Sequence, residues 1–524
     1  MSMLARWCRV PLLALAMVSG AAGAADAMLW FDAGRPTSEA REAVDVLLSA
    51  AEQGLDPRDY GAASLAQQLT QLAQAPKPVD AELLLLEGAL TEALQRYLAD
   101  LQGGRVEPRQ IHADFDLPRN TRPDTLAMLS RAATDRRVAE ALRQAEPTLP
   151  MYASLRQALA RYRVLVNQET AWTSALPPLP GRKLVAGQPY AGLALLARRL
   201  QALGDLSSGT VGTRVFDGAL VNALQAFQQR HGVTPDGVLG RATLQQLEVT
   251  PAQRVRQIEL TMERLRWTPF LQAPRMIVVN VPEFVLRAFE VRDGKVDVKL
   301  SMKVIVGKAM DTRTPLFDEL MRSIEFSPYW NVPPSIARHE TVPRLRRDPA
   351  YFQQQGFEFV GAGGQVVSTL SPEHLEAVMH GGWRIRQRPG PKNALGDIKF
   401  VFPNRDNIYL HHTPAPQLFE RDRRDLSHGC IRVQEPVALA QFVLQDEPQW
   451  TREHIRQAME KGESSTLSLK QPVPVLIAYS TVLVKGDRVF FYPDLYGHDR
   501  LLERALQKRS AALTPAMPAN SAAR

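Results

Sequence analysis

Cysteine is scarce in this chain, with 2 residues among 524. The first, Cys8, lies within residues 1–25, where arginines precede a short apolar run and a group of small residues. This order is typical of a signal peptide, so residues 1–25 are predicted to be cleaved on export. The mature chain then contains Cys430 alone, which excludes an intramolecular disulfide.

Other features are missing as well. The apolar run from Val10 to Val18 is too short to span a bilayer, so no transmembrane segment is expected in the mature chain. Basic residues form no stripe interleaved with aromatic side chains, so the net charge of +8 does not indicate nucleic-acid binding. One cysteine and scattered histidines lack the paired spacing of metal ligands, so no metal site is predicted.

A lone thiol in a compartment that favours disulfides is expected to be either buried or chemically useful. Cys430 ends the run Ser427-His-Gly-Cys430, a small-residue turn where the backbone can approach a substrate carbonyl closely. A thiol nucleophile needs a base that holds it as thiolate, and backbone N–H groups that bind the oxyanion. The alternative is a structural core cysteine, which the Ser-His-Gly flank argues against.

The candidate base lies on a predicted strand upstream of the thiol. Residues alternate between the two faces of a strand, so Tyr409 and His411 share one face and Ile408 and Leu410 the other. This alternation favours His411 over the adjacent His412, although both imidazoles stay candidates from the sequence. Cys430 is therefore predicted to be the nucleophile and His411 its base.

The motifs around these two residues resemble a known family. His411-x-Thr-Pro followed by Ser427-x-Gly-Cys-Ile-Arg432 is similar to the signature of the L,D-transpeptidase catalytic domain, which cross-links bacterial peptidoglycan. Similarity continues upstream through four shorter stretches, at 306–307, 314–315, 330–334 and 390–396. It is strongest to the long periplasmic members, which carry a helical scaffold and a peptidoglycan-binding module, and it covers nearly the whole mature chain.

The motif also suggests roles for neighbouring residues. Backbone N–H groups around His428, Gly429 and Cys430 are predicted to bind the oxyanion. Arg432 either binds a substrate carboxylate or ties down the loop by bonding backbone carbonyls, and the second role is favoured. Three further side chains are predicted to contact the substrate: Tyr409, Trp330 and Ser427.

The resemblance implies a substrate and a product. The donor is expected to be a peptidoglycan tetrapeptide stem that loses its terminal D-alanine and forms a thioester with Cys430. The acceptor is the side-chain amine of diaminopimelate on a neighbouring stem, which gives a 3→3 cross-link. Carbapenems are expected to acylate Cys430, and the chemistry needs no metal or organic cofactor. The expected partners are stem peptides and glycan in the periplasm, together with other cell-wall enzymes.

Two other functions remain open from the sequence. A hydrolase would use the same thioester but let water attack it, giving a carboxypeptidase or an enzyme that detaches wall-anchored proteins. A non-catalytic wall-binding scaffold would carry an inert cysteine, which the pairing of His411 with Cys430 argues against. Nothing in the sequence separates transfer from hydrolysis, because the choice of acceptor depends on the shape of the cleft.

The remaining sequence predicts a multidomain α+β chain. Residues 26–180 have helical periodicity and are predicted to be a helical scaffold, and residues 181–250 a small peptidoglycan-binding-like helical module. Residues 251–495 are predicted to be a mainly β, sandwich-like catalytic domain. Its insertion at 335–388 is interpreted as a lid, with a surface excursion as the alternative. Residues 496–524 are predicted to be a helix end followed by a disordered tail from Lys508.

Overall fold

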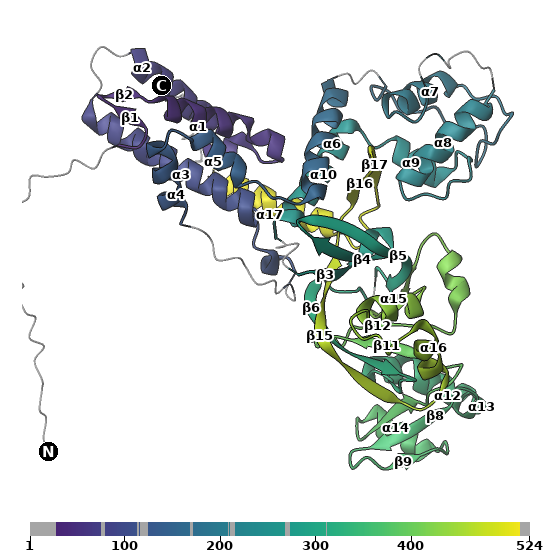
Figure 1. Ribbon diagram of the computed structural model, residues 1–524. Coiled ribbons are helices and arrows are strands. Elements are labelled where there is room, and N and C mark those ends of the chain that lie inside the picture. The colour runs from purple at the N-terminus through teal and green to yellow at the C-terminus, as the bar shows by residue number, and fades with distance from the viewer. Residues whose placement is uncertain are drawn as a thin grey trace, which may run out of the picture.

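The computed structural model describes residues 28–74, 79–112, 115, 124–167, 171–207, 209, 215–267, 273–310 and 312–513. The predicted signal peptide and the last part of the predicted tail lie outside these residues. Within them the chain forms a helical domain, a small helical module and a β domain that carries a separate inserted lobe (Figure 1). None of the helices described combines the length and apolar character that crossing a bilayer requires.

The helical domain packs around one core of leucine, alanine and aromatic side chains. Its first helix begins at Thr37, whose hydroxyl accepts a hydrogen bond from the Ala40 N–H at 3.1 Å, a typical N-cap. The helices are amphipathic, so burial of their apolar stripes against one another provides most of the stabilisation. The elements are β1 (Phe31–Asp32), β2 (Arg35–Pro36), α1 (Ser38–Leu48), η1 (Ser49–Gln53), η2 (Pro57–Tyr60), α2 (Ala62–Gln74), α3 (Asp80–Gly103), η3 (Pro108–Gln110), α4 (Thr125–Thr134) and α5 (Val138–Gln144).

The small helical module consists of α7 (Leu193–Ala202), α8 (Gly218–Arg230) and α9 (Arg241–Leu247). Leu224 and Phe227 on α8 are fully buried, as their spacing predicts. His231, at the end of α8, stacks on Phe227 at 3.9 Å and on Phe491 of the β17 strand at 5.6 Å. This imidazole therefore packs the module against the rest of the molecule and has a structural role.

Two long helices and a hairpin connect the parts of the molecule. Helices α6 (Pro150–Asn167) and α10 (Pro251–Trp267) pack on each other and on the hairpin of β16 (Val482–Lys485) and β17 (Arg488–Phe491), and together they bury one apolar cluster. The C-terminal helix α17 (His498–Leu513), yellow in Figure 1, runs back to the helical domain. There Arg509 pairs with Asp100 at 2.7 Å.

Helix α17 corrects one prediction. The sequence from Lys508 onward is rich in alanine, proline and serine and was expected to be disordered, but residues 508–513 continue the helix. Leu502 and Leu506 of α17 pack into the β-domain core, and the pairing of Arg509 with Asp100 fixes the next turn. These tertiary contacts stabilise a helix end that local composition does not predict.

The β domain is built on one nine-stranded sheet, and the mainly β fold expected from the sequence is confirmed. The strand order is β13-β5-β14-β12-β11-β6-β15-β3-β4, and the first part of β5 also pairs with β4. The sheet therefore closes on itself through β5. Its strands are β3 (Arg275–Asn280), β4 (Val285–Arg292), β5 (Lys295–Gly307), β6 (Phe317–Phe326), β11 (Ile398–Val401), β12 (Leu410–His411), β13 (Asp425–Ser427), β14 (Ile431–Val433) and β15 (Ser465–Ala478).

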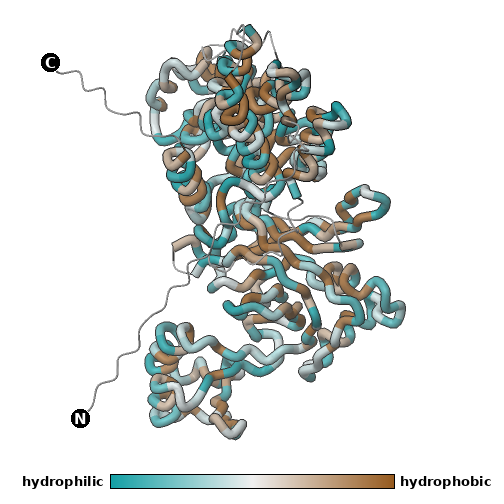
Figure 2. The backbone as a smooth tube through the Cα atoms, turned by 90° about the vertical axis from the view of Figure 1, so that its left-hand side faces the viewer, coloured by the Kyte–Doolittle hydropathy of each residue, from teal (hydrophilic) through white to brown (hydrophobic). Residues whose placement is uncertain are grey.

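The inside of this closed sheet is the largest apolar core of the molecule. Hydrophobic residues, brown in Figure 2, gather along its strands. Helices α15 (Pro436–Val443) and α16 (Arg452–Glu460) contribute Leu439 and Ile455 to the core, and the short helices η4 (Val281–Glu283) and η6 (Pro416–Glu420) lie in its connections. The closed sheet gives the two-residue strand β12 rigid neighbours on both sides.

Residues 330–387 form the inserted lobe, which has its own apolar core around Phe352, Phe359 and Ile385. It contains a four-stranded sheet in the order β7-β10-β8-β9 and lies at the end of the molecule farthest from the helical domain (Figure 1). An insertion was expected at 335–388, and its function as a moving lid remains a prediction. Its elements are β7 (Trp330–Asn331), α11 (Pro334–Ile336), the π-helix η5 (Ala337–Thr341), α12 (Val342–Arg347), α13 (Ala350–Gln354), β8 (Phe357–Gly361), β9 (Val366–Val367), α14 (Pro372–Met379) and β10 (Trp383–Gln387).

Candidate functional site

Two parallel strands bring the predicted base and nucleophile to one face of the sheet. In the pairing of β12 with β14, Leu410 lies opposite Ile431 and His411 opposite Arg432. Leu410 and Ile431 point into the apolar core, where both are fully buried. Since side chains alternate between faces, His411, Arg432 and the adjacent Cys430 lie on the other face.

The Cys430 thiol is half-buried and is held by residues from the segment before β12. Its Sγ–H donates to the Asn407 carbonyl at 3.6 Å, and the Tyr409 hydroxyl and backbone N–H both bond to the sulfur. Burial raises the pKa of the Cys430 thiol, and this effect outweighs those hydrogen bonds and the positive charges of Lys399 and Arg432. The expected resting thiolate is therefore corrected to a neutral thiol.

His411 is buried, and burial followed by the nearby Arg432 guanidinium lowers its pKa to about 3. The ring is thus neutral near pH 7. Its Nδ1 lies 2.5 Å from the His412 carbonyl oxygen, which can only accept, so Nδ1 carries the proton. Nε2 then keeps the lone pair that a general base needs.

The neighbouring His412 points elsewhere. Its Nδ1 lies 3.2 Å from the Asp397 carboxylate and 3.4 Å from the Asp397 backbone N–H. The ring packs so closely on Gly396 that a Cβ there would meet it at 2.6 Å. His411 instead lies beside Tyr409, with ring centroids 5.8 Å apart, as the strand alternation predicts.

Hydroxyl groups hold the carbonyls of the cysteine loop, residues 427–430. Ser427 Oγ donates to the Cys430 carbonyl at 2.5 Å, Thr312 Oγ1 to the Ser427 carbonyl at 3.0 Å, and Thr314 Oγ1 to the Gly429 carbonyl at 2.7 Å. Ser427 is buried, so its predicted contact with substrate is replaced by a role in shaping this loop.

Gly429 adopts φ +116°, a backbone conformation that favours glycine. A Cβ at this position would also meet Ile408 Cδ1 at 3.0 Å. The Gly429 N–H donates to Ser427 Oγ at 3.2 Å, so this predicted oxyanion donor is already engaged within the loop. The backbone N–H groups of His428 and Cys430 remain the candidates.

Arg432 is the register partner of His411, and its Nε is buried without a hydrogen-bond partner among the described residues. The loop carbonyls that Arg432 was expected to bond are occupied by hydroxyls. Its charge acts on its two neighbours instead, because it lowers the pKa of His411 and opposes the rise in the pKa of Cys430.

The other two predicted site residues, Trp330 and His428, contact the inserted lobe. Trp330 lies on β7 and packs against the apolar core of that lobe, and its contact with substrate stays a prediction. His428 reaches the lobe from the loop, because its Nε2 lies 2.6 Å from Glu340 Oε1 in the π-helix η5. This pair connects residues 427–430 directly to the insertion.

A polar row across the sheet was missed in the sequence. Glu325 on β6 lies opposite Lys399 on β11, and Lys399 lies opposite His411. Lys399 Nζ pairs with Glu325 at 3.1 Å and lies 4.5 Å from the centre of the Tyr409 ring. The only sequence signal is an isolated lysine in a strand, and its partner depends on the register of two strands distant in sequence.

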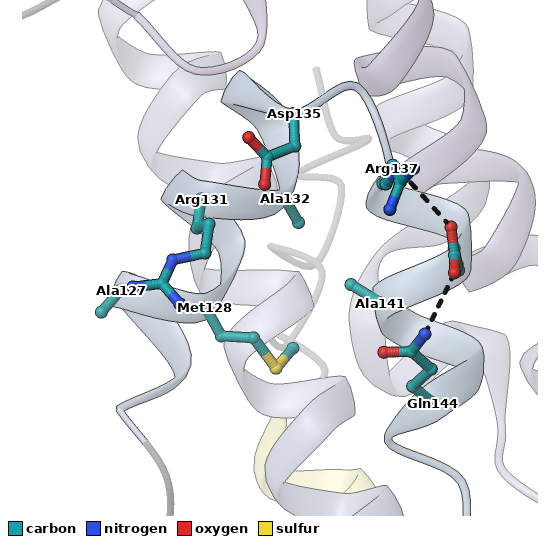
Figure 3. A pocket seen from close by; sticks show the side chains of 9 residues that line it. Ala127, Met128, Arg131, Ala132, Asp135, Arg137, Ala141 and Gln144 are labelled. Atoms are coloured by element: carbon teal, nitrogen blue, oxygen red, sulfur yellow. Dashed lines mark hydrogen bonds and ion pairs between the residues drawn. The ribbon is translucent and has the colours of Figure 1, made fainter.

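Two cavities of about 440 Å³ were found in the described part of the molecule. The one in Figure 3 lies between α4 and α5 of the helical domain and includes Arg131. The other, here called the junction cavity, lies between the helical domain, α17 and the cysteine loop. Its lining residues are His112, Thr312, Arg313, Thr314, Pro315, Leu316, Asp406, Ile408, His428 and His498. No group of three or more potential metal ligands occurs in the residues described.

Three family models match the chain. Residues 23–159 match "Scaffold domain", residues 190–247 "Putative peptidoglycan binding domain", and residues 274–477 "L,D-transpeptidase catalytic domain". A curated relative named "Putative L,D-transpeptidase", from Haemophilus influenzae, is 31% identical over 249 residues, which are 48% of this chain and 49% of the relative. The chain therefore spans about half the length of that relative.

Two solved structures show weak similarity. An L,D-transpeptidase from Xylanimonas cellulosilytica is 14% identical, with a TM-score of 0.16 over 58% of this chain and 100% of that one. A fused Zn-dependent amidase/peptidase/peptidoglycan-binding domain-containing protein from Clostridium acetobutylicum is 12% identical, with a TM-score of 0.18 over 56% and 99%. The assignment rests on the family models instead. Residues 274–477 are similar to the L,D-transpeptidase catalytic domain, and the residues before them are similar to a scaffold domain and to a small module of the peptidoglycan-binding type.

Proposed function

We propose that the chain is a periplasmic acyltransferase that forms 3→3 cross-links between peptidoglycan stems through a thioester on Cys430. The observation that carries this proposal is the β12–β14 register, in which His411 lies opposite Arg432. Cys430 is two residues before Arg432, so strand alternation gives it the same face as His411. The match of residues 274–477 to the L,D-transpeptidase catalytic domain supports peptidoglycan as the substrate.

In the first half-reaction, the Cys430 S–H turns from the Asn407 carbonyl towards His411. His411 Nε2 takes the proton while the sulfur attacks the carbonyl of the third residue of a tetrapeptide stem. The tetrahedral intermediate then breaks its C–N bond. The departing D-alanine amine takes the proton back from His411, and a thioester remains.

In the second half-reaction, the side-chain amine of diaminopimelate on another stem attacks the thioester. His411 accepts a proton from this amine, a C–N bond forms, and the C–S bond breaks. The sulfur leaves as a thiolate and recovers the proton from the imidazolium. The enzyme returns to its neutral pair, and the product is a 3→3 dimer.

Charge develops on the sulfur and on the carbonyl oxygen during both halves. The Tyr409 N–H and hydroxyl, with the charges of Lys399 and Arg432, stabilise the developing thiolate. Backbone N–H groups of the cysteine loop bind the oxyanion, and loss of one such donor typically costs ~3–4 kcal/mol of transition-state stabilisation. Because Cys430 and His411 are both neutral at rest, these groups stabilise the transition state more than the ground state.

The test supplies the purified chain with disaccharide tetrapeptide whose peptide contains diaminopimelate. The expected products are free D-alanine and 3→3 dimers, identified by mass spectrometry, and neither forms with Cys430→Ala. Tripeptide and D-alanine without dimers would instead identify a hydrolase. Folded wild-type chain that releases no D-alanine would favour the non-catalytic scaffold.

A further inference from the structure

The four-stranded sheet of the inserted lobe has a row of arginines on one face. Along β10, Ile385 points into the apolar core of the lobe, so Arg384 and Arg386 lie on the opposite face. Arg388 continues this alternation just beyond the strand, where its backbone N–H donates to the Gly356 carbonyl at 3.0 Å. The three guanidinium groups, here called the arginine row, therefore follow one face of β10.

Among the described residues, only the middle arginine of the row has an acidic partner. Arg386 pairs with the buried carboxylate of Glu358, its register partner on β8, and its guanidinium carbon lies 4.2 Å from the centre of the Tyr329 ring. Arg384 and Arg388 are exposed, and neither forms an ion pair within the part of the chain that the structure describes. At ~3.3 Å per strand residue, the row presents two uncompensated positive charges roughly 13 Å apart.

The arginine row lies on a lobe that borders the reaction centre. Strand β10 leads into β11, which pairs with β12, the strand of His411. Strand β6 likewise leads into β7, and the Ser327 N–H donates to the Asp397 carbonyl at 2.8 Å where these two connections meet. The lobe also contacts the cysteine loop through Glu340 and His428. A polymer bound at the row is thus held beside the proposed site of acyl transfer.

The charge pattern fits a ligand that bears several carboxylates along an extended backbone. Guanidinium groups bind carboxylates through paired N–H donors in a fixed fork. The stem peptide of the proposed substrate has this chemistry, because its D-glutamate, diaminopimelate and terminal D-alanine each bear a free carboxylate. An extended tetrapeptide spans roughly 14 Å, which is comparable to the separation of Arg384 and Arg388.

We propose that the arginine row binds the carboxylates of a peptidoglycan stem that does not itself react, so that the inserted lobe holds the polymer while a neighbouring stem reaches Cys430. Arg384 and Arg388 each pair with a carboxylate, and the pair of Arg386 with Glu358 supports the sheet face between them. The inference rests on the proposed function, because it names a further contact of the same polymeric substrate. It gives the inserted lobe a substrate contact that requires no movement of a lid.

The test measures binding of the full chain to soluble glycan strands. One preparation carries tripeptide stems, which lack the terminal D-alanine and cannot donate an acyl group, and the other has its stems removed by an amidase. An exposed pair of opposite charges contributes up to about fivefold to binding. The double variant Arg384→Gln/Arg388→Gln, here called the row variant, is expected to bind stem-bearing strands about five- to twentyfold more weakly than wild type, and stem-free strands equally well.

The matched control is Arg346→Gln/Arg347→Gln, which removes the same charge from α12 of the same lobe. It is expected to bind both preparations within about twofold of wild type. A loss of less than about twofold in the row variant, an equal loss in the control, or an equal loss on stem-free strands would overturn the inference. Vesicles containing phosphatidylglycerol are tested as well. Vesicle binding that depends on the row, with stem binding unchanged, would assign the row to a membrane surface instead.

Carbapenem acylation of Cys430, measured in parallel, separates this inference from the proposed function. The row variant is expected to be acylated at the wild-type rate, because this reaction involves no second stem. Slower acylation would make the row part of the reaction centre and overturn the inference. Normal acylation with unchanged stem binding in the row variant overturns the row alone, whereas wild type that binds stems through the row but forms no adduct overturns the proposed function.

Discussion

The His411 imidazole determines how the rate of the proposed reaction depends on pH. Burial, followed by the charge of Arg432, lowers its pKa from 6.5 to about 3, so the base form dominates above about pH 4. The rate constant for carbapenem acylation of Cys430 is therefore expected to stay constant within about twofold between about pH 5 and 8. Stopped-flow or timed mass measurements across this range provide the check.

The contrasting outcome is an acylation rate constant that falls at acid pH, an acid limb with its midpoint near the ordinary histidine pKa of 6.5. Such a limb would mean either that His411 titrates near its ordinary pKa during the reaction or that a more exposed group is the base, and its loss in His411→Ala would identify the first case. A Lys399→Met variant is a useful second measurement. Removing that charge withdraws stabilisation from the developing thiolate and is expected to slow acylation while leaving its pH profile flat.

The two adjacent imidazoles are expected to differ when each is removed. His411→Ala should lower the acylation rate of Cys430 by about 10²–10⁴-fold, the usual contribution of a general base. His412→Ala loses the contact with Asp397 but keeps the base, so its acylation rate should fall by no more than about tenfold. Intact-mass time courses on both variants measure this, and the reverse ranking would make His412 the base.

At this scale the sequence predicted which side chains share a face better than it predicted their contacts. Cys430 and the Tyr409–His411 face followed from one motif and from strand alternation, which are local properties. The burial of Ser427 and the Glu325–Lys399 pair did not follow, because each depends on segments brought together only by the fold. Neither did the neutral thiol, since the burial that raises its pKa is a tertiary property.

Among the elements, the π-helix η5 has the most direct connection to the cysteine loop. Its Glu340 lies 2.6 Å from His428 Nε2, and both side chains are partly exposed. An exposed pair of this kind contributes up to about 1 kcal/mol, or roughly fivefold in a local opening equilibrium. Glu340→Gln is therefore expected to raise amide hydrogen exchange of residues 427–430 by up to about fivefold.

The matched control is Glu376→Gln, which removes a pair with Arg346 that stays inside the inserted lobe. This variant should leave exchange of the cysteine loop unchanged. If both variants raised that exchange equally, the effect would come from general loosening of the lobe. Unchanged exchange in Glu340→Gln would show that η5 does not restrain the loop, and the lid prediction would lose its contact point.

Helices were predicted more completely than the sheet. The helices expected within residues 26–180 and 181–250 are present as α1 to α9, because helical periodicity and turn residues are local signals. The closure of the sheet through β5 and the four-stranded sheet of the inserted lobe were not predicted. Which strands pair depends on contacts between distant segments, and hydrophobic periodicity does not indicate those contacts.

At the scale of the whole molecule, a buried ionic network joins α10 to the helical domain. Glu263 and Arg266 on α10 are fully buried with Arg105, and Glu263 lies 3.0 Å from Arg266 and 3.2 Å from Arg105. Although burial opposes ionisation, the two arginines hold the pKa of Glu263 below its usual value. Glu263→Ala leaves two buried cations without their partner and is expected to cost ~3–5 kcal/mol of unfolding free energy.

Urea unfolding of the full chain checks this value, with Glu140→Ala as the control. Glu140 forms an exposed pair with Arg137 at 3.8 Å, so its removal should change the unfolding free energy by less than about 0.5 kcal/mol. A loss of less than about 1 kcal/mol in Glu263→Ala would mean that the helical domain docks without help from this network.

The proposed reaction depends above all on a thioester at the Cys430 sulfur. The most direct measurement is the intact mass of the full chain after incubation with a carbapenem, for wild type, Cys430→Ala and His411→Ala. We expect one adduct on wild type, mapped to Cys430 by peptide sequencing, none on Cys430→Ala, and very slow formation on His411→Ala. Folded wild type without an adduct, or an adduct that persists in Cys430→Ala, would contradict Cys430 as the nucleophile.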